Sequence, residues 1–495
     1  MESYELSVNQ IFSDKMVLPK GKSFRIGGVG PSGVTVKVEI GQQIKRAIVK
    51  RNGQWSVRFD PIYDTQQIFE MYISDNKKQI VIHDIRFGRV VLFAGQSNIG
   101  FRMSQDQDLK SETKHFDLEN IYYYNAPQPS FVYQDGQVTE YESKDTHWHQ
   151  LKVTNLGHMS AVAYYAAKEI HQNSDEPLGI VCVTKDGAPI SIWLSNNTMC
   201  QNKQIQQRIV VPFQQQLDAK NDEEYQTEIK NYRAKVRRHN QRMYRFMKDN
   251  PQVPLGMAIN VVGQTPWPPP ITPDCYLKPG SLFDTMLRKI KYYPFNSVVW
   301  YQGETDGKSR DLYATLLADL INDWRALLAD YSLPFYIVQL PKFAQVARNV
   351  WADIREQQLQ VTRMVSNTHL ISILDTGELY NPHPVQKKLV GQRVGEIVAG
   401  KYYDNTPSLQ KLTKQDGKII LEIRHCQKLK SRPVCFIEAL VNNQWQSVPA
   451  QIQLNTIEVQ TPLCATQLRY AYSNAPTLTL FNEVGYPVAG FKVKI

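Results

Sequence analysis

Five short apolar runs between residues 85 and 402 constrain the fold more than any other feature of this sequence. Each run ends in a polar or glycine-containing loop, and the runs are RVVLFAG, LGIVCVT, NSVVWYQ, PFYIVQL and HLISIL. Helix-like stretches such as MSAVAYYAAKEIHQ and DLYATLLADLINDWRALLAD lie between them. Strands that alternate with helices indicate a parallel sheet covered on both faces. The sequence therefore predicts an α/β domain over residues 85–402.

The segments on both sides of this domain alternate apolar and polar residues, which is typical of β-strands with one buried face. The preceding segment contains VTVKVEIG, KRAIVKR, QWSVRFD and FEMYISD, and the following one contains KIILEIRH, TIEVQT and QLRYAYSN. Short strands at this spacing suggest sandwiches or barrels. We therefore expect an N-terminal β domain over residues 1–84 and a C-terminal β domain over residues 403–495.

A basic stretch interrupts the α/β pattern. Lys and Arg exceed Asp and Glu by 57 to 47, and many of the basic residues lie in a predicted helix over residues 222–248. We place this helix in an insertion at about residues 200–270. Because aromatic interleaving and a second basic element are missing, we predict no nucleic-acid partner. PWPPP at 266–270 then predicts a stiff, irregular loop in which Trp267 is a candidate pocket wall.

The start of the chain and its cysteines bear on its surroundings. MESYELSVNQIFSDKMVLP lacks the features of a signal peptide, and no apolar run reaches the ~18 residues of a membrane span. We therefore expect a cytoplasmic protein with reduced thiols and no membrane partner. No two of the six cysteines form a CxxC pair, so no metal site is predicted. The oligomeric state stays open.

Chemically useful residues follow the predicted strands. Ligand sites in parallel α/β folds lie outside the carboxyl ends of the strands, so these residues are expected to converge. A serine at a strand end can also simply cap a helix. The residues are Gln96, Ser97 and Asn98 after the first run, Gly187 after the second, Gln302 and Glu304 after the third, and Asp375, Asn381 and His383 after the last.

This set of residues suits nucleophilic attack on an ester. A serine hydroxyl is a weak nucleophile until a base takes its proton, and His383 is the natural base for Ser97 near neutral pH. Attack places negative charge on the carbonyl oxygen, which preorganised N–H donors stabilise by several kcal/mol. The donors expected here are the N–H groups of Ser97 and Gly187 and the side chain of Gln302.

Four segments of the chain match a known family in order. GQSN, DGAPISIW, WYQGETD and HP..K..VG.R, the last running from His383 to Arg393, resemble the consensus blocks of the SGNH (GDSL-like) hydrolases in their sialate O-acetylesterase branch. IFSDKMVLPKG and LRYAYSNAPTLTLFNEVGYPVAGFK resemble the flanking modules of that branch. The resemblance implies a flavodoxin-like, three-layer α/β/α hydrolase domain between N-terminal and C-terminal β-sandwich-like domains.

The same resemblance implies an activity, namely removal of O-acetyl groups from sialic acids through an acetyl-enzyme intermediate, without metal or cofactor. By position in the blocks, Ser97 is the nucleophile and His383 the base. Ser97, Gly187 and Gln302 form the oxyanion hole. The implied partner is a small-molecule or glycan substrate.

The sequence departs from the family beside the histidine. Many members have an aspartate two or three residues before it, where this chain has Asn381 and Tyr380. Either Asp375 reaches the imidazole from its strand end, or a backbone carbonyl orients it and leaves a Ser–His dyad supported by Asn381. The second block also has Asp186 where a glycine is common, so a negative charge lies close to the predicted oxyanion hole.

Other residues and other functions remain open at this point. We expect Gln96, Asn98, Glu304 and Trp267 to line the substrate pocket, with Glu304 paired to Arg355 or Arg393 as part of the scaffold. Acetylated xylan or another acetyl sugar is an alternative substrate. A non-catalytic glycan-binding protein on the same scaffold is the alternative from another functional class.

Overall fold

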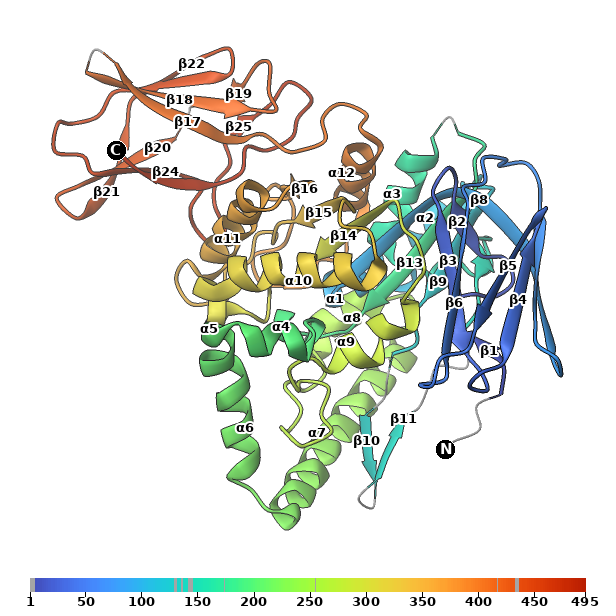
Figure 1. Ribbon diagram of the computed structural model, residues 1–495. Helices are drawn as coiled ribbons and strands as arrows, with labels where there is room; N and C mark the ends of the chain where they lie inside the picture. The colour runs from blue at the N-terminus through green and yellow to red at the C-terminus, as the bar shows by residue number, and fades with distance from the viewer. Residues whose placement is uncertain are drawn as a thin grey trace.

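A computed structural model of the chain describes residues 5–128, 131–134, 137–140, 146–172, 174–253, 255–415, 417–431 and 436–495. The N-terminal strands (blue) and the C-terminal strands (orange to red) lie on opposite sides of a central α/β part (Figure 1). The fold is mixed α/β with several sheets, as the sequence predicts. Among the helices in the described ranges, none has the length and apolar character that crossing a membrane requires.

The centre of the fold is a parallel sheet in which every predicted apolar run forms a strand. Its order is β9-β13-β8-β14-β15-β16, and all neighbouring pairs are parallel. β9 was not among the predicted strands. The strands are β8 (Gln79–Gly95), β9 (Ile121–Asn125), β13 (Leu178–Thr184), β14 (Ser297–Tyr301), β15 (Phe335–Val338) and β16 (Thr368–Ile371).

The direction in which the chain builds this sheet reverses at β8. After β8 the chain forms β9 and β13 on one side, and it then crosses to form β14, β15 and β16 on the other. In open parallel sheets, the crevice at such a reversal is where ligands bind, outside the carboxyl ends of the strands. Ser97 follows the end of β8 by two residues, so it lies at this position.

The N-terminal strands are continuous with the parallel sheet through β8. β7 (Phe69–Ser74) pairs with the first part of β8 in antiparallel fashion, and β2 (Val17–Pro19) pairs with its middle in parallel. The predicted boundary at 84–85 therefore falls inside one strand. A single hydrophobic core includes side chains from Leu6 to Val398. The other strands of this part are β1 (Ser7–Val8), β3 (Phe24–Val29), β4 (Thr35–Ile40), β5 (Gln43–Ile48) and β6 (Gln54–Phe59).

The C-terminal strands form two four-stranded sheets with a hydrophobic core of their own, between Leu409 and Phe491. The predicted β-structure is thus present on both sides of the central part. One sheet contains β17 (Ser408–Gln415), β18 (Lys418–Arg424), β22 (Ala450–Gln453) and β23 (Thr456–Val459), and the other contains β20 (Ile437–Val441), β21 (Gln444–Val448), β24 (Gln467–Tyr470) and β26 (Phe491–Lys494).

The predicted helices also form. α3 (Ala161–His171) begins at Ser160, whose hydroxyl accepts the N–H of Ala163, and α10 (Tyr313–Leu328) corresponds to the DLYATLLADLINDWRALLAD stretch. The basic stretch forms α7 (Asp222–Asp249), which a capping box between Asn221 and Glu224 starts. The helices that precede β16 and follow His383 are α11 (Val350–Met364) and α12 (Lys388–Ala399).

Candidate active site

A sharp turn at the end of β8 presents Ser97. Gly95 has φ +141°, and a Cβ at this position would lie 2.1 Å from the carbonyl oxygen of Tyr301 at the end of β14. Only glycine lets the two strand ends approach this closely. Ser97 then begins the short helix α1 (Ser97–Gly100), and its half-buried hydroxyl is directed at the last loop of the sheet.

The structure brings Ser97 and His383 into direct contact. The Ser97 Oγ lies 2.6 Å from the His383 Nε2, within hydrogen-bond range of a nucleophile and its base. The loop that carries the histidine is fastened to the serine turn, because the Asn98 Nδ2 donates to the Pro382 carbonyl at 3.0 Å. Two residues separated by 286 positions in the sequence therefore form a Ser–His pair.

Asn381 holds the backbone of the histidine rather than its ring. Its Oδ1 accepts the N–H of His383 at 2.9 Å, and its Nδ2 donates to the His383 carbonyl at 2.9 Å. With 6% of its surface exposed, Asn381 is itself fixed in place. The amide of Asn381 therefore sets the position of His383 without supplying charge to the imidazole.

Asp375 does not reach the imidazole, so of the two alternatives the one in which Asp375 orients the ring is wrong. Both of its carboxylate oxygens accept hydrogen bonds from the guanidinium of Arg393, at 2.6 and 2.7 Å. Arg393 is 3% exposed, and its charge holds the carboxylate on the α12 side of the loop. Among the described residues, no hydrogen-bond partner is present for the Nδ1 of His383. The described residues therefore place no carboxylate on the imidazole of the Ser97–His383 pair.

The oxyanion donors predicted from sequence differ in availability. Ser97 and Gly187 both have N–H groups without a hydrogen-bond acceptor among the described residues. Gly187 has φ +65°, and a Cβ there would lie 2.2 Å from the Nε1 of Trp267. The aromatic ring therefore lies directly against the peptide that is expected to bind the oxyanion.

Gln302 is committed to the protein instead. Its Nε2 lies within hydrogen-bond distance of three acceptors, which are the Ala188 carbonyl at 3.0 Å, the Gln96 Oε1 at 3.2 Å and the Asp306 carboxylate, and these share its two hydrogens. Its Oε1 accepts from the Tyr313 hydroxyl. The side chain is fully buried. An amide nitrogen has only two hydrogens, so neither is left for an oxyanion in this arrangement. The predicted donor role of Gln302 is wrong for this conformation, and its bonds to Ala188 instead position the Gly187 loop.

The pocket residues predicted beside the serine form a buried polar chain. The Nζ of Lys387 donates to the Asn98 Oδ1 at 2.7 Å, and the Asn98 Nδ2 donates to Glu304 at 2.6 Å. Lys387 is 1% exposed, and burial lowers its pKa while it raises the pKa of Glu304. These hydrogen bonds connect the first, third and last strand-end loops.

Glu304 therefore has a different partner from the ones predicted. Arg393 binds Asp375, and Arg355 donates to backbone carbonyls, among them that of Pro341. Lys387 was within the HP..K..VG.R pattern, but nothing in the spacing gave it a role. A lysine four residues after a histidine would be noticed only if its burial were known.

Gln96 and Trp267 lie on different sides of the serine. The Gln96 Oε1 accepts hydrogen bonds from Gln302 and Thr305, both at 3.2 Å, so this residue fastens the loop after β14. Trp267 is 52% exposed, and its Nε1 donates to the Tyr276 hydroxyl at 3.1 Å. The loop that carries the tryptophan is held over the site by α7, whose Tyr232 hydroxyl donates to the Pro266 carbonyl.

The comparisons agree with the resemblance predicted from the sequence blocks. The family described as carbohydrate esterase, sialic acid-specific acetylesterase, matches residues 241–393, which include His383 but not Ser97. A sialate O-acetylesterase of Mus musculus is 26% identical over 358 residues, covering 66% of this chain and 59% of the mouse protein. One of Homo sapiens is 22% identical over 510 residues, covering 91% and 84%.

The fold is shared more widely than the sequence. A solved structure of a carbohydrate acetylesterase from Xanthomonas citri superposes with a TM-score of 0.72 at 20% identity, covering 98% of this chain and 99% of the other. The β modules on both sides of the central sheet are therefore part of one shared architecture.

Proposed function

We propose that this chain, which carries a sialic acid-specific acetylesterase domain of the carbohydrate esterases over residues 241–393, hydrolyses O-acetyl groups on sialic acids. The observation that carries the proposal is the 2.6 Å contact between the Ser97 Oγ and the His383 Nε2 at the carboxyl ends of a parallel sheet. A hydroxyl paired to an imidazole at this place suits acyl transfer to serine.

The proposed reaction uses this geometry. His383 accepts the Ser97 proton at Nε2 while Oγ attacks the acetyl carbonyl, and the N–H groups of Ser97 and Gly187 bind the oxyanion. The imidazolium then protonates the sugar oxygen, which leaves as an alcohol and frees an acetyl-enzyme. Water, deprotonated by His383, attacks the acetyl group in the same way and releases acetate.

We assign the central part to the flavodoxin-like, three-layer SGNH arrangement. Five of its strands have the order β13-β8-β14-β15-β16, which is 2-1-3-4-5 when they are numbered along the chain. This is the flavodoxin-like order of doubly wound sheets, with β9 added outside β13. The division into residues 1–84, 85–402 and 403–495 belongs to this assignment, with β8 continuing from the first part into the second.

A cation beside the site supports an acidic sugar as substrate. The Nζ of Lys185 lies 5.0 Å from the centre of the Tyr276 ring, whose hydroxyl binds the exposed Trp267. An exposed aromatic face and a positive charge are what the ring and carboxylate of a sialic acid require. Acetylated xylan carries no carboxylate in its main chain and would use only the aromatic face.

Acetate release distinguishes these possibilities. We expect rapid release from O-acetylated N-acetylneuraminic acid, slower release from acetylated xylan, and stoichiometric labelling of Ser97 by a serine-reactive organophosphonate, located by peptide mass spectrometry. Faster acetate release from acetylated xylan would show that the substrate is a neutral acetylated sugar, while the serine mechanism would stand. A protein that binds sialosides but neither labels nor releases acetate would be a glycan-binding protein and not an esterase.

The pH dependence follows from the surroundings of His383. Burial, and then the charge of Lys387, lower the pKa of His383 to about 4. The base must be neutral to accept a proton, so kcat/KM should be constant near neutral pH and fall as the pH drops through about 4. Replacing Lys387 with methionine removes the positive charge and should raise the pKa of His383. The fall of kcat/KM at acidic pH, the acid limb of the profile, should therefore move to higher pH.

The matched control for this variant is the adjacent Lys388→Met. Lys388 is exposed and forms an ion pair with Glu112 rather than a contact with the imidazole of His383. Its acid limb should coincide with that of the unmodified protein. An acid limb that stays in place in Lys387→Met would show that the lysine does not act on the base.

A further inference from the structure

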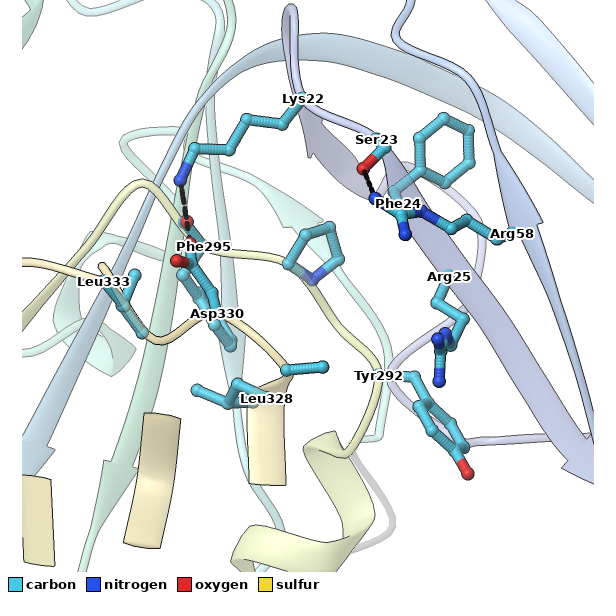
Figure 2. Close-up of a pocket in the computed structure, with 12 residues that line it drawn as sticks. Lys22, Ser23, Phe24, Arg25, Arg58, Tyr292, Phe295, Leu328, Asp330 and Leu333 are labelled. Carbon is cyan, nitrogen blue, oxygen red and sulfur yellow. Dashed lines mark hydrogen bonds and ion pairs between the residues drawn. The ribbon is translucent and has the colours of Figure 1, made fainter. Parts of the chain in front are cut away.

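A second cavity lies away from the Ser–His pair, between the N-terminal strands and the α/β part (Figure 2). Its volume is about 300 Å³, at the lower end of the range in which small ligands bind. One wall comes from β3 and β6 and the other from the segment around Tyr292 and the loop after α10. None of the residues assigned to the reaction lines it.

Two arginines lie side by side on one wall of this cavity. Arg25 on β3 and Arg58 on β6 are register partners in an antiparallel pair, so their side chains leave the same face of the sheet. Like charges placed directly opposite each other destabilise a sheet. Because Arg58 is exposed, water screens part of this repulsion, and an anion between the two guanidinium groups would relieve the rest.

Among the described residues, no carboxylate forms an ion pair with Arg25 or Arg58, although the charge of Arg58 contributes to lowering the pKa of Asp60. The Arg58 Nη2 donates to the Ser23 hydroxyl at 2.8 Å, and Arg25 lies over the Tyr292 ring at 5.8 Å from its centre. Figure 2 shows Arg58 beside Ser23 and Arg25 beside the Tyr292 ring, so the partners of both groups are neutral. Neither arginine has an ion pair among the described residues.

The acidic groups nearby are already paired with other cations. Asp330 is the one carboxylate among the described residues lining the cavity, and Lys22 donates to it at 3.2 Å. Asp60, two residues beyond Arg58, binds Lys45 at 2.8 Å. Arg25 therefore keeps its positive charge without a carboxylate partner among the described residues, while the charge of Arg58 is offset in part by the more distant Asp60.

We propose that this cavity is a binding site for a small anionic ligand, separate from the ester-hydrolysing site, whose carboxylate or phosphate group lies between Arg25 and Arg58. Charge-assisted hydrogen bonds from both guanidinium groups would remove the repulsion in the sheet. The Ser23 hydroxyl adds a neutral polar contact, and the Tyr292 ring supplies an aromatic face for the rest of the ligand. The chemical class is a carboxylated or phosphorylated monosaccharide, or the free anion.

Calorimetric titration of the full chain tests the site. The probes are N-acetylneuraminic acid, inorganic phosphate and, as a neutral sugar, N-acetylmannosamine. Arg25→Gln and Arg58→Gln remove the charge but keep a polar, hydrogen-bonding side chain, and each should weaken binding of the anion by at least about tenfold. Arg46→Gln removes an exposed cation from the neighbouring β5 and should leave binding unchanged.

Thermal unfolding tests whether the substitutions weaken anion binding only because they destabilise the fold. Without ligand, the Tm of Arg58→Gln should be no lower than that of the unmodified protein, because the like-charge pair is gone, but the anion should no longer raise it. Hydrolysis of an acetyl ester should be unaffected in both variants.

Each result decides the question. Arginine-dependent binding of N-acetylneuraminic acid supports a carboxylated sugar as ligand, and arginine-dependent binding of phosphate alone supports a phosphate-bearing one. Equal binding of the neutral sugar, anion binding that survives both substitutions, or no binding of either anion would overturn the proposal.

Discussion

Replacing Ser97 with alanine is expected to lower kcat for acetate release by roughly 10⁴- to 10⁶-fold, because the acyl group loses its acceptor. The remaining rate would come from the free N–H groups of Ser97 and Gly187 and from the binding pocket, which the substitution leaves in place. The measurement is acetate release from an O-acetylated sialic acid under saturating substrate. KM should change little, since the hydroxyl contacts the base and not the pocket wall.

The stability of the Ser97→Ala variant separates chemistry from folding. The hydroxyl makes its one hydrogen bond among the described residues with His383, so the Tm should be close to that of the unmodified protein. Ser104→Ala, at an exposed serine in the same part of the chain, is the matched control and should retain full activity. An active Ser97→Ala variant would rule out the serine mechanism, whatever the substrate.

The sheet could be predicted because its strands are buried on both faces. Runs such as Leu178–Thr184 and Ser297–Tyr301 are predominantly apolar, and all their residues are buried. β9 was missed for a physical reason. Three of its five residues are tyrosines, Tyr122 to Tyr124, which are fully buried as rings yet carry hydroxyl groups that a pattern of apolar residues does not count.

The site could be predicted as a set of loops but not as a set of contacts. Strand ends converge whatever the side chains, so Ser97, Gly187 and His383 were found by position. Which donor meets which acceptor depends on rotamers and on distances of a few tenths of an ångström. For this reason Asp375 and Gln302 received the wrong partners, although each lies in a loop of the site.

The role of Lys387 shows a second limit of the sequence. A lysine at the start of a helix is ordinarily exposed, and only packing shows that this one is buried against the Phe101 ring, 4.7 Å from its centre. Burying a cation is costly unless polar groups compensate it, and Asn98 does so here. The burial therefore marks a residue whose function local spacing could not reveal.

Asp375→Asn is expected to lower the free energy of unfolding by about 3 kcal/mol while the folded enzyme keeps its kcat. The substitution leaves the guanidinium of Arg393, 3% exposed, without its counter-charge. Arg393 still donates to the Ser372 carbonyl at 2.9 Å, and asparagine keeps one acceptor, so the loss should lie at the lower end for a broken buried pair. Thermal unfolding and kcat of the soluble fraction measure the two quantities separately.

The matched control for Asp375→Asn is Asp311→Asn. Asp311 forms the same two-oxygen pair with an arginine, Arg208, but the side chains of this pair are 61% and 45% exposed. Water can replace the lost partner there, so stability should change by less than about 1 kcal/mol. If Asp375 instead oriented the imidazole, kcat would fall by roughly 10⁴-fold, as it does when a triad aspartate becomes asparagine. Loss of stability without loss of kcat would therefore establish that this esterase site operates as a Ser–His dyad held by the backbone bonds of Asn381.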